Sequence, residues 1–151
     1  MKGLAALPSE NLLLGTWKLR SYFQVLETGE RYNMYGEHPD GYISYAADGR
    51  MSVIATSDGR MTPRDENPAD GDQINLYQTM FAYAGTYTVE GDKLVHSVDI
   101  SWNQSFTGTE QVRFYTLVGN TLTITTAPAR FTIEGRDGPL VAVWEKVKGR
   151  S

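Results

Sequence analysis

Two side chains, His96 and Arg113, have the chemistry to move a proton or hold an anion, and both lie in segments of alternating polarity. Within 94–100, His96 shares one face with apolar residues only, because side chains alternate across a strand. An inward imidazole could bind a ligand's carbonyl or phenol, or act as a general base near neutral pH. The other reading is a neutral imidazole that hydrogen-bonds a tyrosine or threonine of a neighbouring strand, since an unpartnered buried polar group is costly.

The orientation of Arg113 decides what its charge can do. Arg113 shares one face of the segment 112–117 with Tyr115 and Leu117, while Phe114 occupies the other face. If Leu117 faces inward, so does Arg113, and a buried guanidinium needs a carboxylate or an anionic ligand as its partner. If Phe114 faces inward instead, Arg113 is a surface charge. Alternation alone does not choose between these readings.

Aromatic residues form the third candidate set, with nine tyrosines and three tryptophans in the chain. Tyrosine has an apolar body and a polar tip, so it suits a cavity that holds a flat, oxygenated ligand. For Trp17 we expect a structural role instead, as a plug at the closed end of a barrel. The candidate catalytic residues are His96 and Arg113, and the predicted ligand-binding residues are Tyr42, Met51, Tyr83, Tyr87, His96, Val98, Trp102, Arg113, Tyr115 and Trp144.

Metal and cofactor motifs are missing from the sequence. There is no cysteine, and two histidines cannot alone build a three-histidine zinc site. The acidic stretch 65–72 fails the calcium-loop template, because Ala69 holds a ligand position and Leu76 stands where the bidentate Glu belongs. No nucleophile elbow, phosphate loop or dinucleotide fingerprint occurs. We therefore expect no metal and no cofactor.

The elements that would position these residues are strands. Alternating runs and turns roughly every ten residues predict about eight to ten short antiparallel strands. Tight turns at 47–49 and 90–92 indicate two hairpins. The expected strands lie at 16–25, 41–46, 50–56, 86–90, 94–101, 109–117, 121–126, 131–134 and 140–146, with a weak one at 31–35.

A closed, all-β, up-and-down antiparallel barrel is the expected fold, because closure removes exposed sheet edges. Such a barrel of about eight strands is either filled or holds one small ligand. A helix of about three turns, capped by Asp70 or Asp72 and ended by Gly85, is expected to lie across the barrel mouth. Residues 1–15 are expected to form an arm with a short helix, capped by Ser9 or Asn11, that closes one end.

Composition limits the partners. The length of 151 residues fits a single domain over residues 1–151. A net charge of −4 argues against nucleic acid, which needs concentrated Lys and Arg. No apolar run approaches the roughly 20 residues of a membrane helix, and no secretion signal is evident, so no membrane partner and a cytoplasmic location are expected. The sequence leaves open a monomer or a homodimer.

Several fragments, taken in order, resemble the lipocalin-like domain family of small bacterial and fungal calycin-type barrels. These fragments are LLGTWKL at 13–19, GYISYAADGRMSV at 41–53, AYAGTYTV at 82–89, LVHSVDISWN at 94–103, GTEQVRFYTL at 108–117 and the end at 143–145. The resemblance covers residues 12–147 and implies an antiparallel barrel with a central cavity, in proteins often encoded near secondary-metabolite genes. His96 and Arg113 match recurrent polar positions of the family, which favours an inward Arg113.

Two functions follow. The first is binding of one small hydrophobic, aromatic or oxygenated molecule in the central cavity, oriented by His96 and Arg113. The alternative, which rests on the analogy with other lipocalin-like barrels, is a cofactor-free isomerase or cyclase acting on a polyketide-like intermediate. In that enzyme His96 would be the acid/base and Arg113 would stabilise an enolate. A filled barrel with a structural role is the third possibility.

Overall fold

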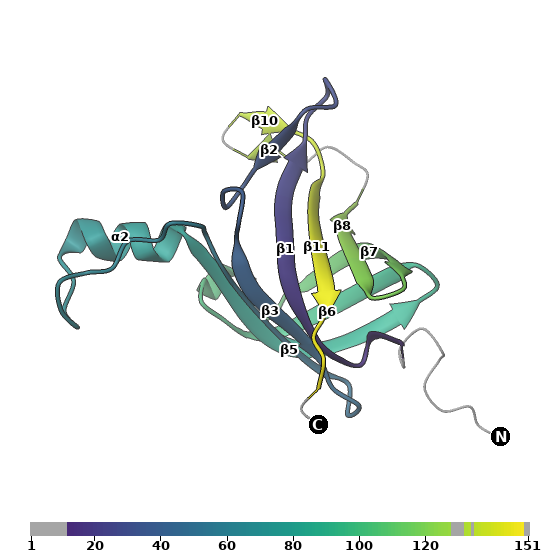
Figure 1. Ribbon diagram of the computed structural model, residues 1–151. Coiled ribbons are helices and arrows are strands. Elements are labelled where there is room, and N and C mark those ends of the chain that lie inside the picture. The colour runs from purple at the N-terminus through teal and green to yellow at the C-terminus, as the bar shows by residue number, and fades with distance from the viewer. Residues whose placement is uncertain (1–11, 128–131, 134, 150–151) are drawn as a thin grey trace.

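The computed structural model describes residues 12–127, 132–133 and 135–149 and contains a closed antiparallel β-barrel (Figure 1). Neighbouring strands pair in the order β11-β8-β7-β6-β5-β4-β3-β1, and β11 pairs back onto β1 to close the barrel. The barrel strands are β1 (Gly15–Val25), β3 (Asp40–Tyr45), β4 (Arg50–Thr56), β5 (Met80–Glu90), β6 (Lys93–Ser101), β7 (Glu110–Val118), β8 (Thr121–Thr126) and β11 (Leu140–Lys146). The predicted up-and-down barrel is confirmed.

Shorter elements lie at the ends of the barrel. β2 (Arg31–Asn33) pairs with the last residues of β1, and β9 (Thr132–Ile133) pairs with β10 (Arg136–Asp137) in a separate small sheet. The helix α2 (Asp70–Gln78) precedes β5, and the 3₁₀ turn η1 (Gln104–Phe106) follows β6. Leu12 and Leu13, just before β1, are also helical. The predicted caps Ser9 and Asn11, and the ends Phe131 and Glu134 of the predicted short strand, lie outside the described residues.

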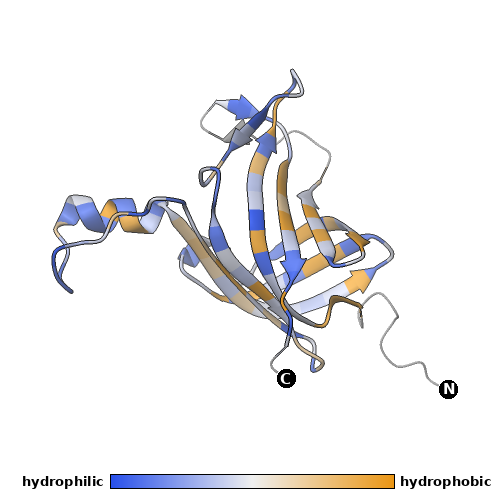
Figure 2. Ribbon diagram, in the orientation of Figure 1, coloured by the Kyte–Doolittle hydropathy of each residue, from blue (hydrophilic) through white to orange (hydrophobic). Residues whose placement is uncertain are grey.

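The barrel interior is packed at the end where the β3–β4, β5–β6 and β7–β8 turns lie. Alternating hydropathy along the strands (Figure 2) sends one side chain in two to this interior. Trp17 is 1% exposed there, and its indole Nε1 donates a hydrogen bond to the carbonyl of Leu13 over 2.9 Å. The predicted structural role of Trp17 is therefore confirmed.

Two β-bulges interrupt the alternation. In β1 the register against β11 shifts between Leu19 and Ser21, and between β5 and β6 it shifts after Ala84. A bulge inserts one residue into one strand, so every side chain beyond it changes face. Tyr22 consequently points inward, whereas Ile100, which was expected on the face of His96, is 65% exposed.

Gly85 lies at the second bulge and does not end a helix as predicted. Glycine is needed at this position in the middle of β5 because the backbone of β6 lies close to its Cα. A Cβ added at Gly85 would lie 1.8 Å from the backbone oxygen of Ser97, well inside van der Waals contact. Only glycine fits this position without moving β6.

Gly85→Ala is therefore expected to destabilise the protein by about 1–3 kcal/mol, the usual cost of overpacking. Urea unfolding measures this loss. Gly71→Ala is the matched control, because a Cβ at Gly71 meets nothing within 4 Å and the residue lies in α2, where alanine is the better helix former. A Gly85→Ala variant as stable as the Gly71→Ala variant would show that the bulge does not require glycine.

The helix is shorter than predicted and does not cover the barrel. α2 ends at Gln78, since residues from Met80 onward pair with β4 as a strand. Its N-cap is Ala69, with no side-chain cap, and none of its residues is buried. Figure 1 shows α2 extending away from the barrel at the end where β5 begins. Because α2 has no continuous apolar stripe, it has no face with which to close the mouth.

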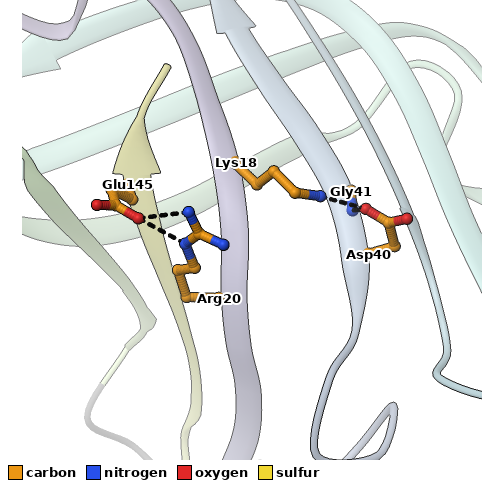
Figure 3. A network of polar contacts seen from close by, with 5 residues as sticks. All are labelled: Lys18, Arg20, Asp40, Gly41 and Glu145. Atoms are coloured by element: carbon orange, nitrogen blue, oxygen red, sulfur yellow. Dashed lines mark hydrogen bonds and ion pairs between the residues drawn. The ribbon is translucent and has the colours of Figure 1, made fainter. Parts of the chain in front are cut away.

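Ion pairs flank β1 on the outer surface of the barrel (Figure 3). Lys18 pairs with Asp40 of β3 and holds the pKa of that carboxyl below its usual value, chiefly through their side-chain hydrogen bond. Arg20 Nε donates to Glu145 of β11 over 2.6 Å. Such exposed pairs contribute little to stability, so the barrel is held closed mainly by backbone hydrogen bonds between strands.

Among the described residues, no helix has the length and apolar character needed to cross a bilayer.

Candidate functional site

A cavity of about 260 Å³ occupies the barrel interior at the end opposite the packed one. Its volume is close to the lower limit of roughly 300–1,000 Å³ for ligand pockets, so it suits one small molecule. We call this space the barrel cavity. The residues that line it are Tyr22, Tyr35, Ile43, Val53, Phe81, Tyr83, His96, Trp102, Phe106, Gln111, Arg113, Ile124, Thr126, Leu140, Ala142 and Trp144.

Five aromatic side chains, Tyr22, Tyr35, Phe81, Trp102 and Phe106, form what we call the aromatic rim. They come from strand ends and loops, which places them at the mouth of the barrel cavity. Their ring centroids lie 5.2–6.3 Å apart from one neighbour to the next, within the range of favourable aromatic pairs. The rim gives an incoming flat molecule an apolar, stacked surface.

Helix α2 touches the rim at one point. The ring of Tyr77 lies 6.1 Å from that of Trp102, centroid to centroid. The helix therefore lies beside the mouth of the barrel cavity. The sequence predicted instead that it would lie across the mouth.

His96 lies in the cavity wall, 2% exposed, with both ring nitrogens hydrogen-bonded to tyrosines. Its Nε2 is 2.8 Å from the hydroxyl of Tyr45, and its Nδ1 is 2.7 Å from the hydroxyl of Tyr83. Burial, with a smaller contribution from the positive charge of Arg113, lowers the pKa of His96 to about 3. The imidazole is therefore neutral at neutral pH.

The hydrogen-bond acceptors available to the hydroxyls of the two tyrosines determine which ring nitrogen of His96 carries the proton. Tyr45 is 2% exposed, and His96 is the hydrogen-bond partner of its hydroxyl among the described residues. Its proton must therefore go to Nε2, because a buried donor without an acceptor is costly. Nδ1 then carries the imidazole proton and donates to Tyr83. The hydroxyl proton of Tyr83, a residue of the cavity wall, is left free for another acceptor.

This arrangement matches the structural reading of His96 better than the acid–base one. A general base works best with a pKa near the operating pH and needs a free nitrogen within reach of its substrate. His96 has neither, since Tyr45 and Tyr83 occupy both nitrogens and its pKa is about 3. Burial also raises the pKa of Tyr83 to about 12, so its hydroxyl stays protonated.

Arg113 faces inward, as the resemblance favoured. β7 directs Gln111 and Arg113 into the barrel cavity, while Tyr115 and Leu117 pack against the core beyond them. The guanidinium donates to the carbonyl of Val112 over 2.9 Å and to the side-chain oxygen of Gln111 over 3.2 Å. Neither acceptor is charged, and within the described part of the chain no carboxylate pairs with Arg113.

Two further donors in the cavity wall have no acceptor. The indole nitrogens of Trp102 and Trp144 are shielded from water, and neither has a hydrogen-bond partner among the described residues. Tryptophan offers a donor only, and a water-sized atom in the barrel cavity does not touch either nitrogen, so the two indoles are not among the groups that would hold a ligand.

Five of the ten predicted ligand-binding residues line the barrel cavity, and their contact with a ligand stays a prediction. These five are Tyr83, His96, Trp102, Arg113 and Trp144. Met51, Tyr87 and Val98 are buried in the packed core, and Tyr115 is half-buried against it. These four do face inward but lie away from the cavity.

Tyr42 is on the wrong side of the wall. It is 45% exposed on the outer surface, with the ammonium of Lys18 4.8 Å from its ring centroid. Its neighbours Ile43 and Tyr45 take the inner face of β3. Because Tyr42 and Tyr45 sit three residues apart, alternation allows only one of them inside, and the larger apolar set goes with Tyr45.

Sequence reasoning missed most of the aromatic rim. Regular alternation from an inward Trp17 and Leu19 predicts an outward Tyr22, and the bulge near Arg20 turns its side chain inward. Tyr35 and Phe106 lie in loops, where alternation gives no signal. The aliphatic residues of the lining occupy inward positions that the alternating pattern predicts, but no feature of their side chains marks them as cavity residues. They are Ile43, Val53, Ile124, Leu140 and Ala142.

Metal-binding groups do not cluster in the described part of the chain. Across residues 12–127, 132–133 and 135–149, no three His, Asp or Glu side chains lie close enough together to hold an ion. Among the described residues, those that line the barrel cavity include one histidine and no carboxylate.

A closed eight-stranded barrel with an aromatic-lined internal cavity is the architecture of lipocalin-type proteins. The model of the lipocalin-like domain family matches residues 14–147, and the chain belongs to this family. The family thus accounts for the fold and for an interior suited to a small molecule.

Two solved structures that are similar to this chain come from Bacteroides. One is a lipocalin-like protein from Bacteroides uniformis ATCC 8492, at 14% identity and a TM-score of 0.48, over 89% of this chain and 98% of that one. Another is an uncharacterized protein from Bacteroides eggerthii DSM 20697, at 13% identity and a TM-score of 0.42, over 89% and 99%. No curated protein matches the chain.

Proposed function

We propose that this protein binds one small apolar, aromatic or oxygenated molecule in the barrel cavity. The observation that carries the proposal is the cavity itself, about 260 Å³ of space behind an aromatic rim in a barrel that is otherwise packed. Mostly apolar walls with a few convergent polar groups are typical of small-molecule sites. Tyr83, Arg113 and Gln111 are the polar groups that would orient the ligand.

The enzymatic alternative gains no support from the site. A cofactor-free isomerase or cyclase would need a group poised to move a proton, and His96 is held neutral between two tyrosines. Stabilisation of an enolate by Arg113 stays a prediction. We also keep, as parts of the proposal that rest on the sequence, a cytoplasmic location, a link to secondary metabolism, a monomer or homodimer, and no nucleic-acid or membrane partner.

Thermal unfolding with a naphthalene-sized probe tests the proposed function. We expect 2-naphthamide or 2-naphthoate, at about one hundred times its dissociation constant, to stabilise the fold by about 2.7 kcal/mol. In a domain of this size that is a rise in Tm of roughly 5–10 °C. A full panel of such aromatic probes without any effect on Tm would contradict the proposal.

Matched alanine variants place the binding site. Ala142 lines the barrel cavity, whereas Ala84 lies on the outer face of β5, opposite Ser52 and Ile100 in the sheet. Ala142→Phe should fill the cavity and abolish the rise in Tm, and Ala84→Phe should leave it unchanged. Equal loss in both variants would place the ligand elsewhere.

A further inference from the structure

We propose that the natural ligand is an anion, an aromatic carboxylic acid or a comparable flat monoanion, whose negative group pairs with Arg113. This inference rests on the proposed function, since it names the chemistry of the molecule that the barrel cavity holds. It is carried by the charge of the cavity wall and by the hydrogen bonds that the wall leaves unmade.

The described part of the cavity wall carries one positive charge. Among the described residues that line the barrel cavity, Arg113 is the one charged side chain, because His96 is neutral and no Asp or Glu is present. The surrounding side chains are mostly aromatic and aliphatic, so the local dielectric is lower than that of water and the charge is less screened. A wall of this kind attracts a negative ligand and repels a cation.

The guanidinium has donors to spare. Arginine has five N–H groups in a planar fork, and the structure shows Arg113 donating to two neutral oxygens, of Val112 and Gln111. The fork matches the geometry of a carboxylate, which can accept two parallel hydrogen bonds from it. The bond to Gln111 also holds the side chain of Arg113 against β7, which lowers the entropy lost when a ligand binds.

Tyr83 needs an acceptor as well. The hydroxyl proton of Tyr83 is free once Nδ1 of His96 donates to its oxygen. A carboxylate offers about four lone-pair sites and no donor when ionised, so it can accept from both Tyr83 and Arg113.

An uncharged ligand would make the arrangement costly. Displacing water from the cavity leaves the guanidinium desolvated with no counter-charge, and an unpaired buried charge is strongly unfavourable. An anion removes that cost and adds charge-assisted hydrogen bonds. Arg113 therefore selects between molecules of the same shape by their charge.

Isothermal titration at pH 7 with 2-naphthoate and 2-naphthamide tests the inference, because the two probes have nearly the same shape and only the first is ionised. A hydrogen bond to a charged group predicts that the wild-type protein binds 2-naphthoate about 10- to 100-fold more tightly. Equal affinities, or tighter binding of the amide, would overturn the inference while leaving the proposed function intact. Binding of neither probe would overturn both.

Two arginine variants locate the charge that is responsible. Arg113→Gln should lower the affinity for 2-naphthoate by about 10- to 100-fold and should raise the affinity for 2-naphthamide or leave it unchanged, because the unpaired charge is removed. Arg113→Lys, which keeps the charge but loses the fork, should retain part of the preference. Arg20→Gln is the matched control, since Arg20 pairs with Glu145 on the outer surface. An unchanged preference in Arg113→Gln, or an equal loss in Arg20→Gln, would overturn the assignment to Arg113.

Discussion

Acidification from pH 6.5 to pH 4.5 should cost this protein roughly 2 kcal/mol of folding free energy through His96 alone. Its pKa is about 3 in the folded protein and near 6.5 when exposed, so between these values the unfolded chain holds one more proton than the folded chain. Stability from this residue is fully present above pH 6.5 and is lost as the pH falls towards 3. Tyr45, Tyr83 and Arg113 are the groups that face the ring, and each of the tyrosines stays neutral over this range.

Urea unfolding at several pH values measures this effect. The wild-type protein should lose up to about 1.4 kcal/mol per pH unit more than His96→Gln, in which carboxylates still titrate but position 96 does not. In the wild type, the NMR signal of the His96 ring should not shift between pH 8 and pH 5. Parallel stability profiles for the two proteins, or a His96 signal that titrates near pH 6.5, would refute the neutral, tyrosine-bonded imidazole.

Truncation of the plug, Trp17→Ala, should destabilise the fold by about 3–5 kcal/mol, the typical loss for a large aromatic residue in a core. Trp17 is 1% exposed in the packed end of the barrel and anchors the carbonyl of Leu13 through its indole nitrogen. The variant removes both the packing and that hydrogen bond. Denaturant unfolding followed by circular dichroism gives the loss directly.

Trp17→Phe separates the packed end from the barrel cavity. This variant keeps an aromatic ring in the core and should recover part of the stability lost in Trp17→Ala. Because Trp17 does not line the cavity, its affinity for 2-naphthoate should stay within about threefold of the wild type. A loss of less than about 1 kcal/mol in Trp17→Ala would show that the end near Trp17 is not closely packed.

Strand alternation predicts the face of a side chain well, as long as the strand is regular. His96 precedes the bulge on β6, and alternation predicts its inward face correctly. Ile100 and Tyr22 lie beyond bulges, and each takes the face opposite to the one that regular alternation predicts. A bulge is set by backbone approach, as at Gly85, and one sequence carries no clear signal for it.

Alternation does not report depth along the barrel axis. Met51 and Tyr87 point inward as predicted, but they lie among the packed residues near the hairpin turns and away from the cavity. Which inward residues surround empty space depends on how side chains from several strands fill each layer. That is a property of the assembled barrel and cannot be obtained from the period of one strand.

The roles of His96 and Arg113 depend on tertiary contacts that the sequence alone does not identify. Both readings of His96 follow from one alternating strand, and the hydroxyls of Tyr45 and Tyr83 decide between them. The sequence leaves the orientation of the Arg113 side chain open, and in the structure β7 directs it, with Gln111, into the cavity. Its lack of a carboxylate partner in the described chain is a tertiary fact.

The most direct test of the hollow, ligand-holding interior is a set of intermolecular nuclear Overhauser effects between 2-naphthoate and isoleucine methyl groups. Ile43 and Ile124 line the barrel cavity, while Ile54 and Ile100 lie exposed on its outer surface. The bound probe should show nuclear Overhauser effects to the methyl groups of Ile43 and Ile124. It should show none to those of Ile54 and Ile100. Contacts to the outer pair alone would show that the interior of the barrel does not hold the ligand.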